Sequence, residues 1–361
     1  MRTSKSPLRI LKTALAIGRK TFRSYSHRYS PKTFTQPQLF ACLVLKESLK
    51  LDYRGISALL QDSAALREAI GLRHTPHFTT LQKASKRLLR RRRVQRLLNQ
   101  TLVRARKVKL LKKRVALAAI DSSGFEAQHA SRYFVKRRER GGDFREKRHR
   151  ITYRHFPKLA VLCDCRSHLI LAAHPERGPQ PDFGNLDPVF TQAARRIRIA
   201  TLLADAGYDA EWIHIFVRFV FGTRTIIPAE HGRKSTSPPV GYHRRLMRFR
   251  LNKKKYGQRW QVETVFSMIK RRLGEATGAR TYHSQCRALL LKVVTHNILI
   301  VTIVIRVFYR ATAYRFLGNI MASRADAFFD PGDGRFGTGQ PYKEEVKLVS
   351  ARNQSFEPGG K

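Results

Sequence analysis

The sequence VALAAID at residues 115–121 decides the expected fold, because six apolar residues run without interruption into an aspartate. A short continuous apolar run of this kind is typical of a central strand that is buried on both faces of a sheet. The sequence TLLAD at residues 201–205 repeats the arrangement, since a shorter, mostly apolar run again ends in an aspartate. Functional sites in open α/β sheets lie at the carboxyl ends of the strands. We therefore expect Asp121 and Asp205 to meet at one edge of a sheet.

The segments around these two strands predict an α/β fold, a mixed sheet with helices on both faces. Residues 159–163 and 169–173 predict two further strands, and the five residues between them suit a hairpin. The remaining expected elements are helices at 186–199, 211–221, 256–273 and 287–316, a last strand at 225–228, and irregular segments at 132–153 and 229–255.

Residues 1–110 predict a separate helical region for DNA binding or dimerisation, before a domain at 111–318 and a disordered tail at 319–361. Apolar spacing predicts a helix at 37–50 and a second one that Asp52 caps. A long basic helix is expected from Thr79, and it carries four consecutive arginines, Arg90, Arg91, Arg92 and Arg93. These arginines suit phosphate contacts, although a solvated helix face is the alternative interpretation.

The charge of the chain points to a polyanionic partner. The 361 residues include 72 Lys and Arg against 25 Asp and Glu, a formal net charge of +47. Each phosphate that such a protein neutralises releases condensed counterions, so nucleic acid is the first candidate and an anionic membrane surface is the second. The apolar run at 298–305 is far shorter than the roughly 20 residues of a membrane span. We expect it to form a buried helix, with no membrane partner.

Four cysteines in the chain are too few for a disulfide scaffold, which fits a reducing cytosol. Cys163 and Cys165 form a C-x-C pair, but no second ligand pair follows at a regular spacing that would indicate zinc. The basic N-terminus has no proper apolar core of a signal peptide.

The third acidic residue of interest is Glu263, on the predicted helix at 256–273. At 100° per residue, Tyr256, Arg259 and Lys270 all lie within about 40° of Glu263 and form one narrow polar stripe. Carboxylates brought together repel unless a cation lies between them, and hard cations such as Mg²⁺ take oxygen ligands. Local alternatives remain, because strand-end aspartates can cap turns and Arg259 with Glu263 can form an i to i+4 ion pair. Asp164 and Asp182 are fallback metal ligands with local explanations, in a turn and a cap.

These motifs resemble a known family. The pattern Tyr256-x2-Arg259-x3-Glu263-x6-Lys270 matches the Tyr-Arg-Glu-Lys signature of bacterial insertion-sequence transposases at all four positions. AAIDSSGF around Asp121 and LLADAGYD around Asp205 resemble the two aspartate motifs of that family. The resemblance covers about residues 35 to 312, and the helix signature is its most specific part.

The resemblance implies a ribonuclease-H-like DDE domain that cleaves transposon ends and joins their 3′-hydroxyls to target DNA. Asp121, Asp205 and Glu263 would be the catalytic, metal-binding triad, holding two Mg²⁺ or Mn²⁺ ions, and Tyr256, Arg259 and Lys270 would hold the DNA backbone. It also implies a homodimer on double-stranded DNA and a cytoplasmic, nucleoid-associated location. The alternative is an inactive, transposase-derived DNA-binding protein without catalysis.

The net charge generates a first prediction, that the protein binds duplex DNA of any sequence through many phosphates. In a salt titration, the logarithm of affinity should fall with the logarithm of salt concentration at about −0.9 per phosphate neutralised. Alanine at Arg90, Arg91, Arg92 and Arg93 should weaken binding to all sequences and make the slope shallower. A slope that these substitutions leave unchanged would exclude the arginines from phosphate contact.

Overall fold

A computed structural model describes residues 3–127, 156–178, 180–229 and 238–327, with side chains up to residue 305. The segment expected to be irregular at 132–153 and the tail beyond Ala327 lie outside the described residues. The chain divides into two compact units, Met1–Phe308 and Tyr309–Lys361. All elements that position the site discussed below belong to the first unit.

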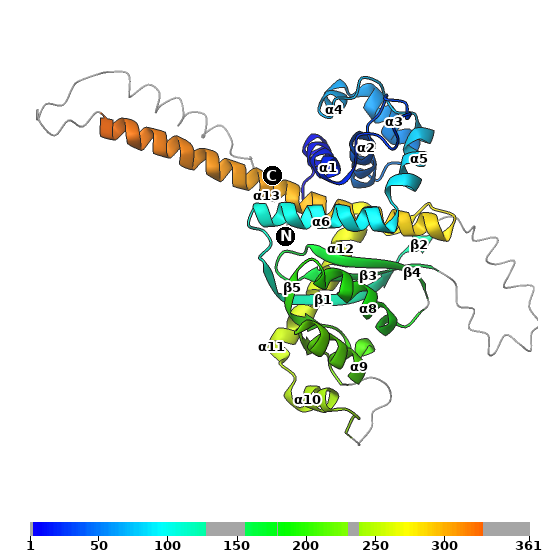
Figure 1. Ribbon diagram of the computed structural model, residues 1–361, viewed down its shortest axis with the longest axis vertical. Coiled ribbons are helices and arrows are strands. Elements are labelled where there is room, and N and C mark those ends of the chain that lie inside the picture. Colours follow the sequence, from blue (N-terminus) through cyan, green and yellow to red (C-terminus); the bar gives the residue numbers. More distant parts are fainter. Residues whose placement is uncertain (1–2, 128–155, 179, 230–237, 328–361) are drawn as a thin grey trace, which may run out of the picture. The chain divides into compact units, whose positions relative to one another are not determined.

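A mixed five-stranded sheet lies at the centre of the first unit, in the order β4-β3-β1-β5-β6 (Figure 1). β1 pairs antiparallel with β3 and parallel with β5; β3 and β4 pair antiparallel, and β5 and β6 pair parallel. The strands are β1 (Arg114–Gly124), β3 (Phe156–Asp164), β4 (Ile170–Gly178), β5 (Arg198–Leu203) and β6 (Arg224–Ile226). A separate short pair joins β2 (Glu126–Ala127) to β7 (Ala276–Thr277). The mixed sheet and its hairpin agree with the sequence prediction.

Successive side chains along the central strands point to opposite faces of the sheet and pack into two separate hydrophobic cores, one on each face. Ala119 and Leu203 pack with α12 (Trp260–Leu273), while Ala118 and Leu202 pack with α8 (Leu186–Ala194) on the other side (Figure 1). Asp121 has the same parity along β1 as Ala119, so its side chain belongs to the face that α12 covers. The sheet thus brings an aspartate and the helix of Glu263 to one face.

The N-terminal region is helical, as the sequence predicts, but the long basic helix expected from Thr79 is divided in two. The helices are α1 (Pro7–Thr21), α2 (Gln36–Ser48), α3 (Tyr53–Asp62), α4 (Ala64–Glu68), α5 (Phe78–Leu88) and α6 (Arg91–Lys107). Asp52 caps α3 through the Gly55 amide at 2.6 Å, as expected. Arg90 has an extended backbone, with φ −70° and ψ 143°, and this breaks the expected helix between α5 and α6. Leu88 and Leu89, immediately before the break, are both buried.

The second half of the chain is more helical than its composition predicts. The segment 229–255, expected to be irregular, contains α10 (Tyr242–Arg250) and α11 (Lys253–Tyr256). The predicted helix at 256–273 divides into α11, the 3₁₀ turn Gly257–Arg259 and α12. The remaining helices are α8, a 3₁₀ turn at Asp182–Asn185, another at Ala206–Tyr208, α9 (Glu211–Ile215) with a π-helical extension at Phe216–Val220, and α13 (Tyr282–Ala327). α13 continues to Ala327, so the start of the predicted disordered tail at 319–361 is helical.

α13 fastens the hairpin between β3 and β4 to the core. The Asn297 side chain accepts from the Ile170 amide and donates to the Ile170 carbonyl, both at 2.9 Å. His296 Nε2 lies 2.9 Å from the carbonyl oxygen of His168, whose own Nε2 lies 2.5 Å from Gln261 Oε1 on α12. The part at Tyr282–Ile305 is long and apolar enough to span a membrane, but 78% of that window is buried in the protein. It therefore acts as a core helix that aligns the hairpin with α12.

This network generates a stability prediction. Asn297→Ala should lower the free energy of unfolding by about 3 kcal/mol, because it leaves the buried polar groups of Ile170 without partners. Thr302→Ala is the matched control, since the Thr302 hydroxyl donates only to Ile298 in its own helix, at 2.7 Å. Urea denaturation of both variants measures the difference, and equal losses would show that the Asn297 contacts add nothing specific.

Candidate active site

Asp121 and Asp205 lie across two neighbouring parallel strands. The last parallel pair of β1 and β5 is Ala119 with Leu203, and each aspartate follows its strand's member of that pair by two residues. The sequence predicts that Asp121 ends its strand, but β1 continues beyond it, because pairing with β3 runs through Asp121–Val161 to Gly124–Lys158. Asp205 does follow the end of β5. The two aspartates thus occupy matching positions beyond the paired region of neighbouring parallel strands, and the charge of Asp205 acts on Asp121.

Local hydrogen bonds fix the direction of both carboxylates. Asp205 caps the 3₁₀ turn at Ala206–Tyr208 by accepting from the Gly207 amide at 3.0 Å, so its local capping role is real. Asp121 accepts from the Ser122 amide at 2.8 Å. Each bond uses only one of the lone-pair positions of a carboxylate, which leaves further acceptor sites for a cation or a donor.

Burial, helped by the carboxylates of Asp205 and Asp182, raises the pKa of Asp121 to about 6, although the Ser122 amide and the Arg259 guanidinium act to lower it. Only 19% of the Asp121 side chain is exposed. A buried carboxylate beside other carboxylates favours its neutral form, because the charge is costly there. A cation placed between the acids would reverse that preference.

Arg259 is the cation that the structure places among these acids. Its guanidinium donates to Glu263 Oε1 at 2.6 Å and lies 3.8 Å from Asp121 Oδ2. The i to i+4 ion pair considered from the sequence therefore exists, with 54% of the Glu263 side chain exposed. Within the described ranges, no three His, Cys, Asp or Glu side chains are close enough to hold a metal ion. Arg259 contacts two members of the expected triad, but the triad is not closed around a common point.

The other two signature residues have different surroundings. Tyr256 ends α11, is half-buried and packs against the core. The Lys270 ammonium lies over the ring of Phe125, 5.4 Å from its centroid. Because a 3₁₀ turn at Gly257–Arg259 precedes α12, the four residues do not form one stripe on a single α-helix as predicted.

The arginine run lies at the start of α6. Arg90, Arg91 and Arg92 are exposed, and Arg91 contacts the His174 ring on β4. Arg93 donates to the Arg87 carbonyl at 3.0 Å, and burial together with neighbouring arginines lowers its pKa. Crowded like charges of this kind are stabilised by an anion, which is consistent with the expected phosphate contact.

Two further residues lie near the aspartates. The sequence did not predict Tyr208, and it indicated Asp182 only as a fallback metal ligand. Tyr208 is fully buried, and its hydroxyl lies 3.4 Å from the Ser122 hydroxyl. Burial, followed by the charges of Asp182, Asp121 and Asp205, raises the Tyr208 pKa. Asp182 pairs with Lys158 at 2.5 Å. The spacing of Tyr208 three residues after Asp205 could have revealed it, because one 3₁₀ turn returns the chain to the same side. Asp164, the other fallback, bonds the Ser167 amide of its own turn at 3.1 Å.

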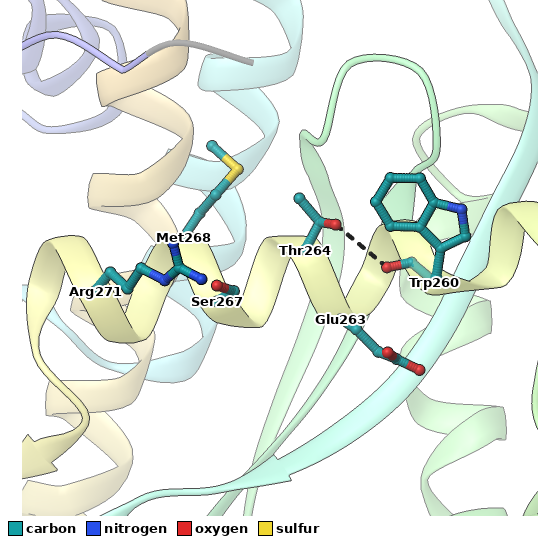
Figure 2. Close-up of a pocket in the computed structure, with 6 residues that line it drawn as sticks. All are labelled: Trp260, Glu263, Thr264, Ser267, Met268 and Arg271. Carbon is teal, nitrogen blue, oxygen red and sulfur yellow. Dashed lines mark hydrogen bonds between the residues drawn. The ribbon is translucent and has the colours of Figure 1, made fainter.

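A shallow hollow of about 420 Å³ runs along the outer side of α12, beside Glu263. Figure 2 shows that every lining side chain comes from α12: Trp260, Glu263, Thr264, Ser267, Met268 and Arg271. Trp260 is 53% exposed. The outer face of the Glu263 helix is therefore partly open to solvent.

The pKa of Asp121 generates a prediction about stability and pH. Folding raises the pKa of the Asp121 carboxyl group from 3.8 to about 6. The folded state therefore loses stability as pH increases between those two values. Without divalent metal, Asp121→Asn should therefore raise the free energy of unfolding at pH 8 by up to about 3 kcal/mol, and by less at pH 5. Thermal or urea denaturation at the two pH values measures this. An effect of Asp121→Asn that is the same at both would contradict the assigned burial.

A comparison with known protein families identifies the family of the chain. No curated protein matches the chain. The family model described as the transposase DDE domain matches residues 116–298, which is just over half of the chain. The matched segment contains β1, β5 and α12, and with them Asp121, Asp205 and Glu263. The chain therefore belongs to the family of transposases that carry a DDE domain.

Proposed function

We propose that this transposase cleaves the ends of an insertion sequence and joins the freed 3′-hydroxyls to target DNA. The observation that carries the proposal is the placement of Asp121 and Asp205 on neighbouring parallel strands, two residues beyond the same register pair. Glu263 lies on a helix that packs against β1, and Arg259 contacts both Glu263 and Asp121. These contacts support a site in which Asp121, Asp205 and Glu263 act together with Arg259.

The sheet supports a ribonuclease-H-like fold for the catalytic region, which we assign to residues 111–318. Three strands follow one another as antiparallel neighbours, β1, β3 and β4, and two parallel strands, β5 and β6, extend the sheet on the other side of β1. β1 is then the central strand, and the acid on it faces the helix that carries the third acid. We assign residues 1–110 to DNA binding or dimerisation.

The acids suit divalent metal ions by their chemistry. Carboxylate oxygens are the ligands that Mg²⁺ prefers, and Mn²⁺ accepts them as well. A cation between Asp121 and Asp205 would relieve the repulsion that contributes to the raised pKa of Asp121. Two bound ions would supply an activated water and stabilise the leaving oxygen of a phosphodiester. Asp121 and Asp205 would hold them, and Glu263 would join when its side chain turns inward.

Arg259 would control when Glu263 becomes available. Its guanidinium neutralises Glu263 and lies close to Asp121, so it supplies positive charge where a metal ion would do so. A phosphate of the DNA backbone offers the planar fork of arginine a bidentate partner of higher charge. Transfer of Arg259 to that phosphate would free Glu263 for the metal, so that DNA entry would complete the site. Lys270 would add a point charge, and Tyr256 would position the backbone.

The partner of this site would be double-stranded DNA, both as transposon end and as target, and the acting form would be a homodimer on DNA in the cytoplasm, at the nucleoid. The charge of +47 supports a polyanionic partner. The four arginines Arg90, Arg91, Arg92 and Arg93 would add phosphate contacts remote from the chemistry.

The triad generates the central prediction about activity. Asp121→Ala, Asp205→Ala and Glu263→Ala should each abolish Mg²⁺-dependent cleavage of transposon-end DNA while duplex binding remains. Asp187→Ala is the control, because Asp187 lies in the first turn of α8 and bonds Thr191 of the same helix. Full cleavage by any triad variant would remove that residue from the site.

Arg259 and Lys270 should differ in effect from the arginine run. Arg259→Ala and Lys270→Ala should reduce the single-turnover cleavage rate by about 100-fold, because misplacement near the scissile phosphate costs rate. Arg92→Ala should mainly weaken binding. If both helix variants cleaved at the normal rate, the result would favour the alternative hypothesis, a DNA-binding protein without catalysis.

A further inference from the structure

The segment from α10 to α11 presents aromatic rings on a strongly basic surface. Between Tyr242 and Tyr256 the sequence contains seven Arg and Lys residues and no Asp or Glu. Tyr242 is 73% exposed and Phe249 is 74% exposed. Exposed rings of this size lose the favourable free energy of burial, so their presence on a charged helix needs a reason.

α10 is held firmly on α9 by its opposite face. The Glu211 carboxylate accepts from the amides of His243 and Arg244, at 3.0 Å each, at the start of α10. Arg244 also forms a two-point pair with Asp209, at 2.9 and 2.7 Å. Gly241, with φ 106°, makes this approach possible, because a Cβ there would overlap the Glu211 carboxylate. The orientation of α10 is therefore fixed, and its outer face is set by the fold.

The outer face of α10 carries two rings with a cation between them. At 100° per residue, Tyr242, Arg245 and Phe249 lie within an arc of about 60°, while Met247, which is buried, lies on the opposite side. The rise of the helix separates Tyr242 from Phe249 by about 10 Å, so each ring would receive a different partner group. Lys253 continues the basic surface at the start of α11.

The combination of rings and cations selects the chemistry of the partner. Duplex DNA offers phosphates to the cations, but its bases are stacked on one another and leave exposed rings without a partner. Unpaired bases expose their faces, and proteins bind single strands by stacking those faces on aromatic side chains beside a basic groove. A second copy of this chain is disfavoured on the same surface by the repulsion of like charges.

We propose that the outer face of α10, continued by α11, binds an unpaired stretch of a DNA strand. Bases would stack on Tyr242 and Phe249, and the phosphates between them would contact Arg245 and Lys253. The chain runs from α11 through the turn at Gly257–Arg259 into α12. The surface that binds the strand therefore directly precedes the helix of Glu263 in the sequence. This property goes beyond the proposed cleavage and can be measured without it.

The test is fluorescence anisotropy of the full chain with a labelled oligothymidylate of about 15 nucleotides, in EDTA so that no cleavage occurs. Phe249→Ala and Tyr242→Ala should each weaken binding of this strand about fivefold or more, because each removes one aromatic ring on which a base stacks. Binding of a duplex of equal length should change less than twofold. Tyr29→Ala is the matched control, since Tyr29 is 73% exposed but lies in the N-terminal helical region, between α1 and α2.

Substitution of Phe249 by other side chains separates stacking from general apolar contact. Phe249→Trp should retain single-strand binding and Phe249→Leu should lose it, because only the aromatic ring offers a π face. Equal losses for the single strand and the duplex, or full binding by Phe249→Leu, would overturn the proposal. So would a change in sedimentation that identifies these rings as a contact between copies of the chain.

Discussion

The burial of the Asp121 carboxylate beside the charge of Asp205 is the constraint on which the proposed site depends. Parallel pairing of β1 with β5 fixes the register that brings the two groups together, and the antiparallel pairing of β1 with β3 extends beyond it. Burial keeps water from screening the charges, so Asp121 retains its proton to a higher pH than usual. The arrangement is unfavourable for the folded chain alone. It becomes favourable when a cation is shared, and Arg259 partly supplies that charge in the structure.

The few acids of this basic chain explain how the site remains distinct. Most other described acids have local structural work. Asp52 caps α3, Asp164 closes the hairpin turn, and Glu47 pairs with Lys292 of α13 at 2.8 Å. Asp209 and Glu211 hold α10. Because basic side chains are in such excess, an acid that had no such partner would pair with the nearest Lys or Arg.

Much of the sheet could be predicted from the sequence, because buried strands appear as short apolar runs. The runs before Asp121 and Asp205 predicted both central strands, and the residues from Asp164 to His168 predicted the hairpin turn. The helical character of α10 escaped prediction, because its helix is held by distant partners, Asp209 and Glu211, rather than by apolar periodicity. The break at Arg90 also escaped prediction, because the basic run around it carries no Pro or Gly that would end a helix. For the site, spacing indicated the acids but not the contact of Arg259 with two of them, nor the place of Tyr208.

The most direct test is the binding of Mn²⁺ to the full chain at pH 8, followed by the electron paramagnetic resonance signal of the free ion. We expect wild type to bind Mn²⁺ and both Asp121→Asn and Asp205→Asn to lose most of that binding, since each removes a charged oxygen ligand. Asp187→Asn, an acid in the first turn of α8, should bind as wild type does. Unchanged Mn²⁺ binding in both active-site variants would contradict a metal site shared by the two strands.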